Sequence, residues 1–85
     1  MKAREFDQVI GKFGMETRNG RDLHAWLTYD GKVVVRTKRS FGREDPIVMF
    51  VRQQLKLDER QLNEAIRCTF GRDDYIKHLR AKGVI

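Results

Sequence analysis

The sequence has one cysteine, one proline and no long apolar run. The single cysteine, Cys68, excludes an internal disulfide, and no His or Cys spacing typical of a metal site is present. No stretch approaches the ~20 apolar residues of a membrane helix, and no signal-peptide pattern opens the chain. We therefore expect a cytoplasmic protein with no metal, no other cofactor and no membrane partner.

The length and composition predict one small folded domain, residues 1–85. A chain of this size buries roughly 60–65% of its unfolded surface, so its core is modest and each cap and turn matters. Hydrophobic residues make up 40% of the chain and charged residues 35%, which is typical of a folded protein and not of a disordered one.

Positive charge is concentrated in one segment. Residues 1–17 carry three bases and three acids, and residues 44–85 carry eight bases and seven acids. Residues 18–43 carry seven bases and two acids, a balance of +5 within a total of +6. Such a field attracts polyanions, and the pI near 9.9 favours a nucleic acid partner. The seven bases are Arg18, Arg21, Lys32, Arg36, Lys38, Arg39 and Arg43.

The first half of the chain predicts a helix followed by a three-stranded antiparallel meander. Apolar residues at helical spacing indicate a helix over residues 2–13, and Gly14 follows where a left-handed residue would end it. Asp30-Gly31 suits a two-residue primed hairpin turn. The expected strands are residues 15–18, 23–29 and 32–37.

Regular pairing around Asp30-Gly31 predicts two faces for this sheet. It places Trp26 opposite Val35 and His24 opposite Thr37. One face would then carry Trp26, Thr28, Val33 and Val35 with His24, and the other Leu23, Ala25, Leu27 and Val34 with Arg36. Both faces are partly apolar, so the sequence leaves open which of them meets the helices.

The second half of the chain predicts three helices. Asp45-Pro46 is a suitable N-cap and first residue for a helix over residues 46–56. Asp58 and Gln61 have the spacing of a capping box for a helix ending near residue 68. Residues 72–82 form the last expected helix. The fold class is therefore α+β, with an α-β-β-β-α core over residues 1–57 and two further helices in a C-terminal extension, residues 58–85.

His24 is the candidate catalytic residue. It lies in a predicted strand of the basic segment, and a histidine there could act as general base or acid in cleaving an RNA phosphodiester. The alternative is a structural histidine held by hydrogen bonds. His78, beside Lys77 and Arg80, is expected to face solvent.

The clustered bases are candidate phosphate ligands, and the alternative is a solvated sheet edge protected by charge. Trp26 and Phe41 are candidates for stacking on an unpaired base. The pattern favours core packing for Trp26 and exposure for Phe41, which lies between Ser40 and Gly42. Cys68 is expected to be a small buried apolar residue.

The central part of the sequence resembles the HicA toxins (YcfA-like proteins) of bacterial toxin–antitoxin pairs. In that family a central strand begins with Gly-Ser-His and is followed by a turn often containing Asp-Gly and by a valine-rich strand. The resemblance covers about residues 3–62, with Asp22 and Leu23 in place of the glycine and serine. The matching stretches here are Gly20-Arg21-Asp22-Leu23-His24-Ala25-Trp26, Asp30-Gly31, Val33-Val34-Val35 and Arg52-Gln53-Gln54-Leu55-Lys56-Leu57-Asp58-Glu59.

The resemblance implies a fold like that of double-stranded-RNA-binding domains, RNA cleavage that uses His24, and inhibition by a partner antitoxin. We therefore expect an RNA-binding domain that is either an mRNA-cleaving toxin or an inactive relative. The alternative is a protein-interaction module without nucleic acid activity. A third interpretation is DNA binding by the C-terminal helices, although the mixed charges of residues 59–68 are not typical of a helix that reads DNA.

Overall fold

The structure, a computed structural model, describes residues 1–41, 45–67 and 69–85. It confirms the predicted α+β class and the predicted order of elements. No helix in these ranges is long and apolar enough to cross a membrane. The elements are α1 (Ala3–Lys12), β1 (Glu16–Asn19), β2 (Asp22–Tyr29), β3 (Lys32–Ser40), α2 (Val48–Leu55), α3 (Glu59–Ile66) and α4 (Arg72–Ala81).

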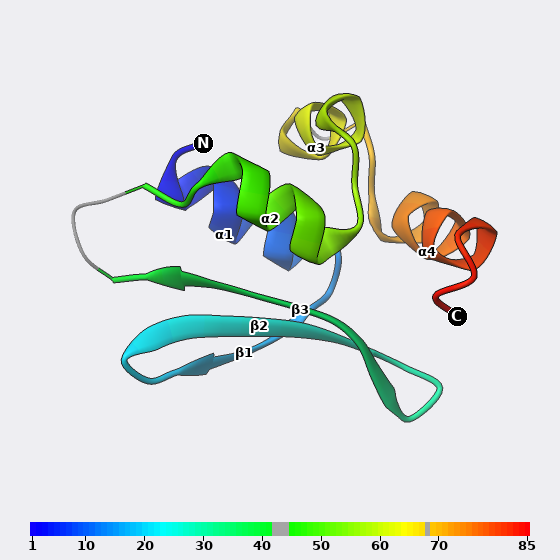
Figure 1. Cartoon of the computed structure of the whole chain (residues 1–85), viewed down its shortest axis with the longest axis horizontal. Helices are drawn as coiled ribbons and strands as arrows, with labels where there is room; N and C mark the ends of the chain where they lie inside the picture. Colours follow the sequence, from blue (N-terminus) through cyan, green and yellow to red (C-terminus); the bar gives the residue numbers. More distant parts are fainter. Residues whose placement is uncertain (42–44, 68) are drawn as a thin grey trace.

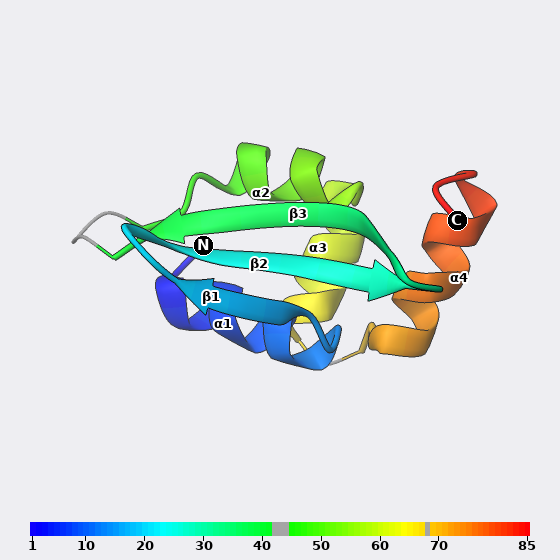
Figure 2. The same cartoon turned by 90° about the horizontal axis from the view of Figure 1, so that it is seen from below.

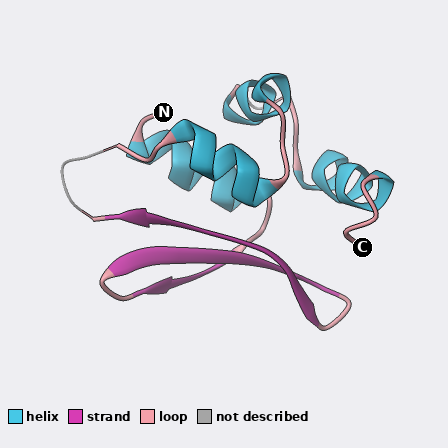
Figure 3. Ribbon diagram, viewed as in Figure 1, coloured by secondary structure: helices cyan, strands magenta, loops and turns pink. Residues whose placement is uncertain are grey.

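The helices cover one face of the sheet and leave the other open. The three strands are antiparallel in the order β1-β2-β3, so β1 and β3 are both edge strands. Figures 1 and 3 show α1 and α2 lying along the same side of the sheet, with α3 above them and α4 near the β2–β3 hairpin. Figure 2 shows the opposite side, where all three strands face the viewer with the helices behind them.

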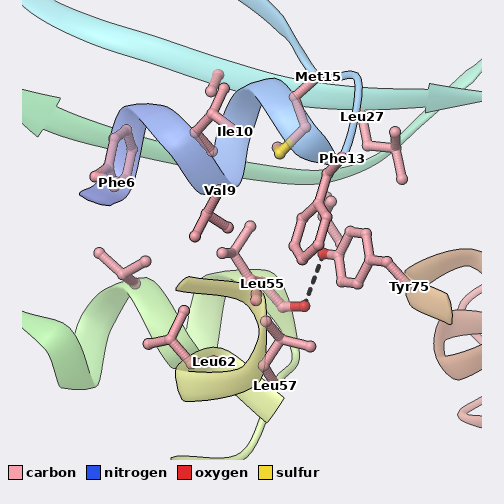
Figure 4. Close-up of a cluster of buried hydrophobic side chains, with 14 of the residues drawn as sticks. Phe6, Val9, Ile10, Phe13, Met15, Leu27, Leu55, Leu57, Leu62 and Tyr75 are labelled. Atoms are coloured by element: carbon pink, nitrogen blue, oxygen red, sulfur yellow. Dashed lines mark hydrogen bonds between the residues drawn. The ribbon is translucent and has the colours of Figure 1, made fainter. Parts of the chain in front are cut away.

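One hydrophobic core joins the sheet to all four helices (Figure 4). Phe13 of α1's C-terminal end stacks on Tyr75 of α4, with ring centroids 4.0 Å apart. The Tyr75 hydroxyl donates a hydrogen bond to the carbonyl oxygen of Leu55, at 2.7 Å. The C-terminal extension also contributes buried side chains from α3, Leu62 and Ala65. The extension therefore packs onto the core and is part of the same folded unit.

The turn and cap signals at Gly14, Asp30-Gly31 and Asp58–Gln61 are confirmed. Gly14 adopts a left-handed conformation after α1, with φ of 66°. Asp30 and Gly31 have φ of 53° and 77°, as a primed hairpin turn requires. Asp58 accepts a hydrogen bond from the Gln61 backbone at 2.7 Å, and the Gln61 side chain accepts one from the Asp58 backbone at 3.0 Å.

The predicted start of α2 is wrong by two residues. The helix begins at Val48, after Ile47 in an extended conformation, and no side chain caps it. Asp45 lies two residues before the N-cap position, Ile47, and therefore does not cap the helix. Its carboxylate lies 3.5 Å from the ammonium nitrogen of Lys2 in an exposed ion pair.

The predicted register of the hairpin holds only next to the turn. Tyr29 pairs with Lys32 and Thr28 with Val33, as expected, but an irregularity follows between Leu27 and Thr28. Val34 is the extra residue of this β-bulge, because Leu27 pairs with Val35. A bulge shifts every later residue of its strand by one position, so Val35 and Arg36 lie on the opposite faces from those predicted.

Candidate nucleic-acid interface

The side of the sheet away from the helices, here called the open face, is built by alternate residues of the strands. In β2, Ala25 and Leu27 are buried against the helices, so His24, Trp26 and Thr28 point the other way. Cross-strand partners share a face. The open face therefore consists of Glu16, Arg18, Asp22, His24, Trp26, Thr28, Val33, Arg36, Lys38 and Ser40.

His24 lies between two bases on this face. Arg18 of β1 pairs with it on one side and Lys38 of β3 on the other. Directly opposed residues have Cβ atoms about 4.5–5.5 Å apart, so both cationic side chains start within reach of the ring. The imidazole is exposed and has no hydrogen-bond partner within the described ranges. The strand pairing thus presents a histidine to solvent between two positive charges.

Trp26 lies on the open face and not in the core, so the prediction of core packing is wrong. Ala25, Leu27 and Val35 fill the helix-facing side of these strands. The indole N–H donates to Glu16 Oε2 at 2.8 Å. An indole N–H needs a polar partner, and the carboxylate across the β1–β2 pairing supplies it on the solvent side.

The open face is hollowed around the histidine and the tryptophan. The hollow has a volume of about 550 Å³ and is lined by both rings and by the backbone of Gly20. Arg18 and Arg36 also line it, and neither forms an ion pair within the described ranges. Lys38 lies 3.6 Å from the Asp22 carboxylate, in a pair that remains partly exposed. Two unpaired guanidinium groups therefore flank an aromatic side chain in one shallow depression.

Arg39, which was expected to bind nucleic acid, faces the helices instead. Its Nε and NH2 atoms donate to the two carboxylate oxygens of Asp7 in α1, at 2.8 and 2.9 Å. The side chain is only 14% exposed, and hydrogen bonding to Asp7 raises the pKa of its guanidinium. Phe41 is half exposed, as predicted, and its ring centroid lies 5.5 Å from the Arg39 guanidinium carbon. This bidentate pair joins β3 to α1.

The other predicted bases lie apart from the histidine or outside the described residues. Arg21 lies in the turn between β1 and β2, and Lys32 lies beside the hairpin turn at the far end of the sheet. Arg43 lies outside the described residues, as does Cys68, for which burial was expected. Of the seven bases, the sheet brings Arg18, Arg36 and Lys38 together around His24 and Trp26.

His78 is half-buried and holds three helices together, so the prediction that it faces solvent is wrong. Its Nδ1 lies 3.0 Å from the side-chain nitrogen of Gln61 in α3, and its Nε2 contacts the carbonyl oxygen of Lys56 after α2. The Gln61 amide oxygen accepts from the Asp58 backbone, so its nitrogen faces the ring. His78 therefore has a structural role, and His24 is the histidine available to a ligand.

Comparisons with protein-family models, with curated protein sequences and with solved structures find no significant match. The resemblance to HicA toxins therefore stays a prediction that depends on His24 and the residues around it. Within the described ranges, no three His, Cys, Asp or Glu side chains gather where they could hold a metal ion.

Sequence reasoning missed Glu16 as a member of the site. The residue lies in a four-residue strand whose register no local signal fixed. Its carboxylate accepts hydrogen bonds from both Trp26 and Thr28, at 2.8 and 2.6 Å. The alternation of Trp26 and Thr28 along β2 is the signal that points to a shared partner on the neighbouring strand.

Proposed function

We propose that the protein binds single-stranded RNA on the open face. Trp26 stacks on an unpaired base, and Arg18, Arg36 and Lys38 neutralise neighbouring phosphates. The observation that carries this proposal is the position of a partly exposed indole directly opposite Arg36 across the sheet, with Arg18 beside it in the same hollow. A base held in a duplex hides its faces, so this arrangement favours an unpaired strand.

The geometry of β2 supports contact with more than one nucleotide. His24 and Trp26 are two residues apart on the same face, which is about 6.6 Å along a strand. A base stacked on Trp26 therefore leaves the next sugar and phosphate beside His24 and its flanking bases. The RNA strand would then cross the sheet diagonally, from Arg36 beside Trp26 towards Arg18 beside His24.

Intrinsic fluorescence tests this proposal directly, because Trp26 is the only tryptophan in the chain. We expect an unlabelled 12-nucleotide single-stranded RNA to quench its emission saturably at 0.15 M salt. The same RNA annealed to its complement, and a DNA of equal sequence, are compared to rank the three ligands. If the fluorescence anisotropy of a labelled RNA shows binding while the tryptophan emission stays unchanged, the RNA binds elsewhere and the assignment is overturned.

Two substitutions at position 26 separate stacking from general stability. Trp26→Phe keeps a ring and should retain most of the affinity, whereas Trp26→Ala should lose about 5- to 150-fold, which corresponds to about 1–3 kcal/mol per stacked base. Arg60→Ala on α3 is the control for loss of an exposed side chain outside the open face, since Arg60 is 87% exposed and lies in a different part of the molecule.

A second candidate function is cleavage of the bound RNA with His24 as general base. The observation that favours it is the exposed imidazole between Arg18 and Lys38. His24 would take the proton of a 2′-hydroxyl, and the 2′-oxygen would attack the adjacent phosphorus. The bond from phosphorus to the 5′-oxygen breaks, which leaves a 2′,3′-cyclic phosphate and a 5′-hydroxyl protonated by the imidazolium or by water. The flanking cations would stabilise the charge that builds on the phosphate.

The cleavage hypothesis predicts loss of turnover without loss of binding. His24→Ala should abolish cleavage while the RNA affinity changes less than threefold, since the imidazole is not one of the phosphate ligands. A single 2′-deoxy nucleotide at the scissile position should block the wild-type reaction. Cleavage that persists in purified His24→Ala protein, or in the deoxy substrate, would rule out this mechanism and leave RNA binding intact.

A further inference from the structure

The outer edge of β3 is a long strand edge without a partner strand. β3 has nine residues and pairs with β2 on its inner side only. Within the described ranges, no other backbone segment forms hydrogen bonds with it. Figure 2 shows this edge bordering the sheet on the side where α2 lies. Such an edge is a template for another strand.

A groove runs along this edge, between β3 and α2. Two hollows form it, and they meet at Gln54 of α2, whose side-chain oxygen accepts a hydrogen bond from Thr37 at 2.7 Å. One hollow borders Val34 and the other borders Ile47 and Phe50. The groove therefore follows β3 over most of its length.

The helix side of this groove is apolar. Ile47 is 59% exposed and Phe50 is 54% exposed, although both are large hydrophobic side chains. They lie at the start of α2, which has no charged residue in its first turn. Large apolar side chains that are this exposed beside an open strand edge indicate a surface that another chain covers.

The sheet side of the groove carries two bases, Arg36 and Lys38, and one acid, Asp22, which lies 3.6 Å from Lys38. Arg36 and Lys38 point to the open face, whereas Val35 and Thr37, which alternate with them along β3, are buried towards the helices. A strand added to β3 would place its own side chains alternately on these two faces. One set would lie beside Arg36 and Lys38, and the other set would lie over Ile47 and Phe50.

We propose that an extended segment of a partner protein pairs with the outer edge of β3, with acidic and apolar residues in alternation. The acidic residues face Arg36 and Lys38, and the apolar residues cover Ile47 and Phe50. This inference shares Arg36 and Lys38 with the proposed RNA site, but the strand edge of β3 and the apolar side chains of α2 carry it without Trp26.

The charge of β3 argues against a second copy of this chain as the occupant. β3 carries four bases and no acid, so pairing with itself would bring like charges face to face. The whole chain has a net charge of +6, which adds repulsion between copies. A partner strand rich in acidic residues would avoid both of these repulsions.

The test uses a fluorescein-labelled heptapeptide, Glu-Val-Glu-Val-Glu-Val-Glu, with capped ends and the full-length protein. We expect saturable binding at 0.05 M NaCl and at least tenfold weaker binding of the same peptide with lysine in place of glutamate. N-methylation of the three central residues removes strand donors on both edges and should also weaken binding at least tenfold.

Two exposed residues of α2 give a matched pair of protein variants. Phe50→Ser should weaken peptide binding at least tenfold, and Ile47→Ser is a second groove variant should the first disturb the fold. Met49→Ser is the control, because Met49 is 51% exposed but does not line the groove, and it should leave affinity within twofold.

Three results would overturn the proposal. These are no binding of the acidic peptide, equal binding by the wild type and both groove variants, or equal binding of the N-methylated peptide. A concentration-dependent dimer in sedimentation experiments that is lost in Phe50→Ser would show that a second copy occupies the groove. Loss of RNA binding in Trp26→Ala, with peptide binding unchanged, would show that the peptide does not require the proposed stacking residue and that the two proposals can fail separately.

Discussion

Glu16 and Trp26 face each other across the β1–β2 pairing, and the carboxylate accepts the indole N–H at 2.8 Å. The same carboxylate oxygen accepts the hydroxyl of Thr28 at 2.6 Å. Glu16 therefore holds the indole N–H of a side chain that also lines the hollow. It also places a negative charge among the bases of the open face, which opposes the binding of an anion.

This arrangement predicts that Glu16→Gln strengthens RNA binding. The glutamine oxygen can still accept the indole N–H, but the substitution removes one negative charge from the open face. We expect the affinity for single-stranded RNA to rise about three- to tenfold at 0.1 M salt, because nearby exposed charges are only partly screened there. Fluorescence titration of Trp26 measures the change. Weaker binding would mean that the carboxylate itself contacts the RNA.

The three bases of the open face predict a moderate salt dependence of RNA binding. Each neutralised phosphate of a single strand contributes about −0.7 to the log–log slope, so three contacts give about −2. Replacing Arg18, Arg36 or Lys38 by glutamine should each reduce the slope by close to one contact. Arg60→Gln should leave it unchanged. A slope near zero in the wild type would contradict phosphate binding on this face.

The hydrogen bond between Tyr75 and Leu55 predicts a measurable loss of stability in Tyr75→Phe. The phenylalanine keeps the stacking on Phe13, but the carbonyl oxygen at the end of α2 loses its buried partner. We expect the free energy of unfolding to fall by about 1–2 kcal/mol in urea titrations. Tyr29→Phe is the control, because its hydroxyl bonds to Arg80 at an exposed site and should cost less.

Burial of Tyr75 also predicts a loss of stability at high pH. Burial raises the pKa of its hydroxyl above the ordinary value of 10.0. Above pH 10 the unfolded chain therefore releases a proton that the folded protein retains, and stability falls as the pH rises further. The expected slope for this group is about 1.4 kcal/mol per pH unit, and it should be missing in Tyr75→Phe. Identical slopes in the two proteins would show that other groups cause the decline.

The ion pair between Arg39 and Asp7 predicts coupling between β3 and α1. Two charge-assisted hydrogen bonds form, but Asp7 remains 45% exposed, so solvent weakens the pair. A double-mutant cycle with Asp7→Asn and Arg39→Gln should give a coupling of about 0.5–1 kcal/mol at low salt. Arg39→Gln should also change RNA affinity less than Arg36→Gln does. A larger effect from Arg39 would place RNA on the helix side of β3.

The parts of the fold that were predicted correctly depend on local chemistry. Gly14, Asp30-Gly31 and the Asp58–Gln61 capping box each act within a few residues, so their signals are complete in the sequence. The class and order of elements follow from those boundaries and from hydrophobic periodicity. The local signal at Asp45-Pro46 fails because Ile47 stays extended and α2 begins only at Val48.

The candidate site was predicted only in part, because its composition depends on strand register. Charge density indicated the segment that includes most of the open face, and His24 is exposed there. Regular pairing nevertheless put Arg36 on the face opposite His24, and no residue type at Val34 indicates a bulge. No sequence pattern distinguishes Arg39, which faces the helices, from the bases of the open face, since its partner Asp7 lies 32 residues away.

The extra residue in β3 affects how the sequence of a related protein should be aligned with this one. A chain shorter by one residue between Gly31 and Val35 could pair without an irregularity and still present the counterparts of Arg36 and Lys38 beside the histidine. If such a sequence were aligned with the one-residue difference in the wrong place, solvent-facing cations would be assigned to the interior and interior valines to the surface. The number of residues in the hairpin is therefore as informative as their identity.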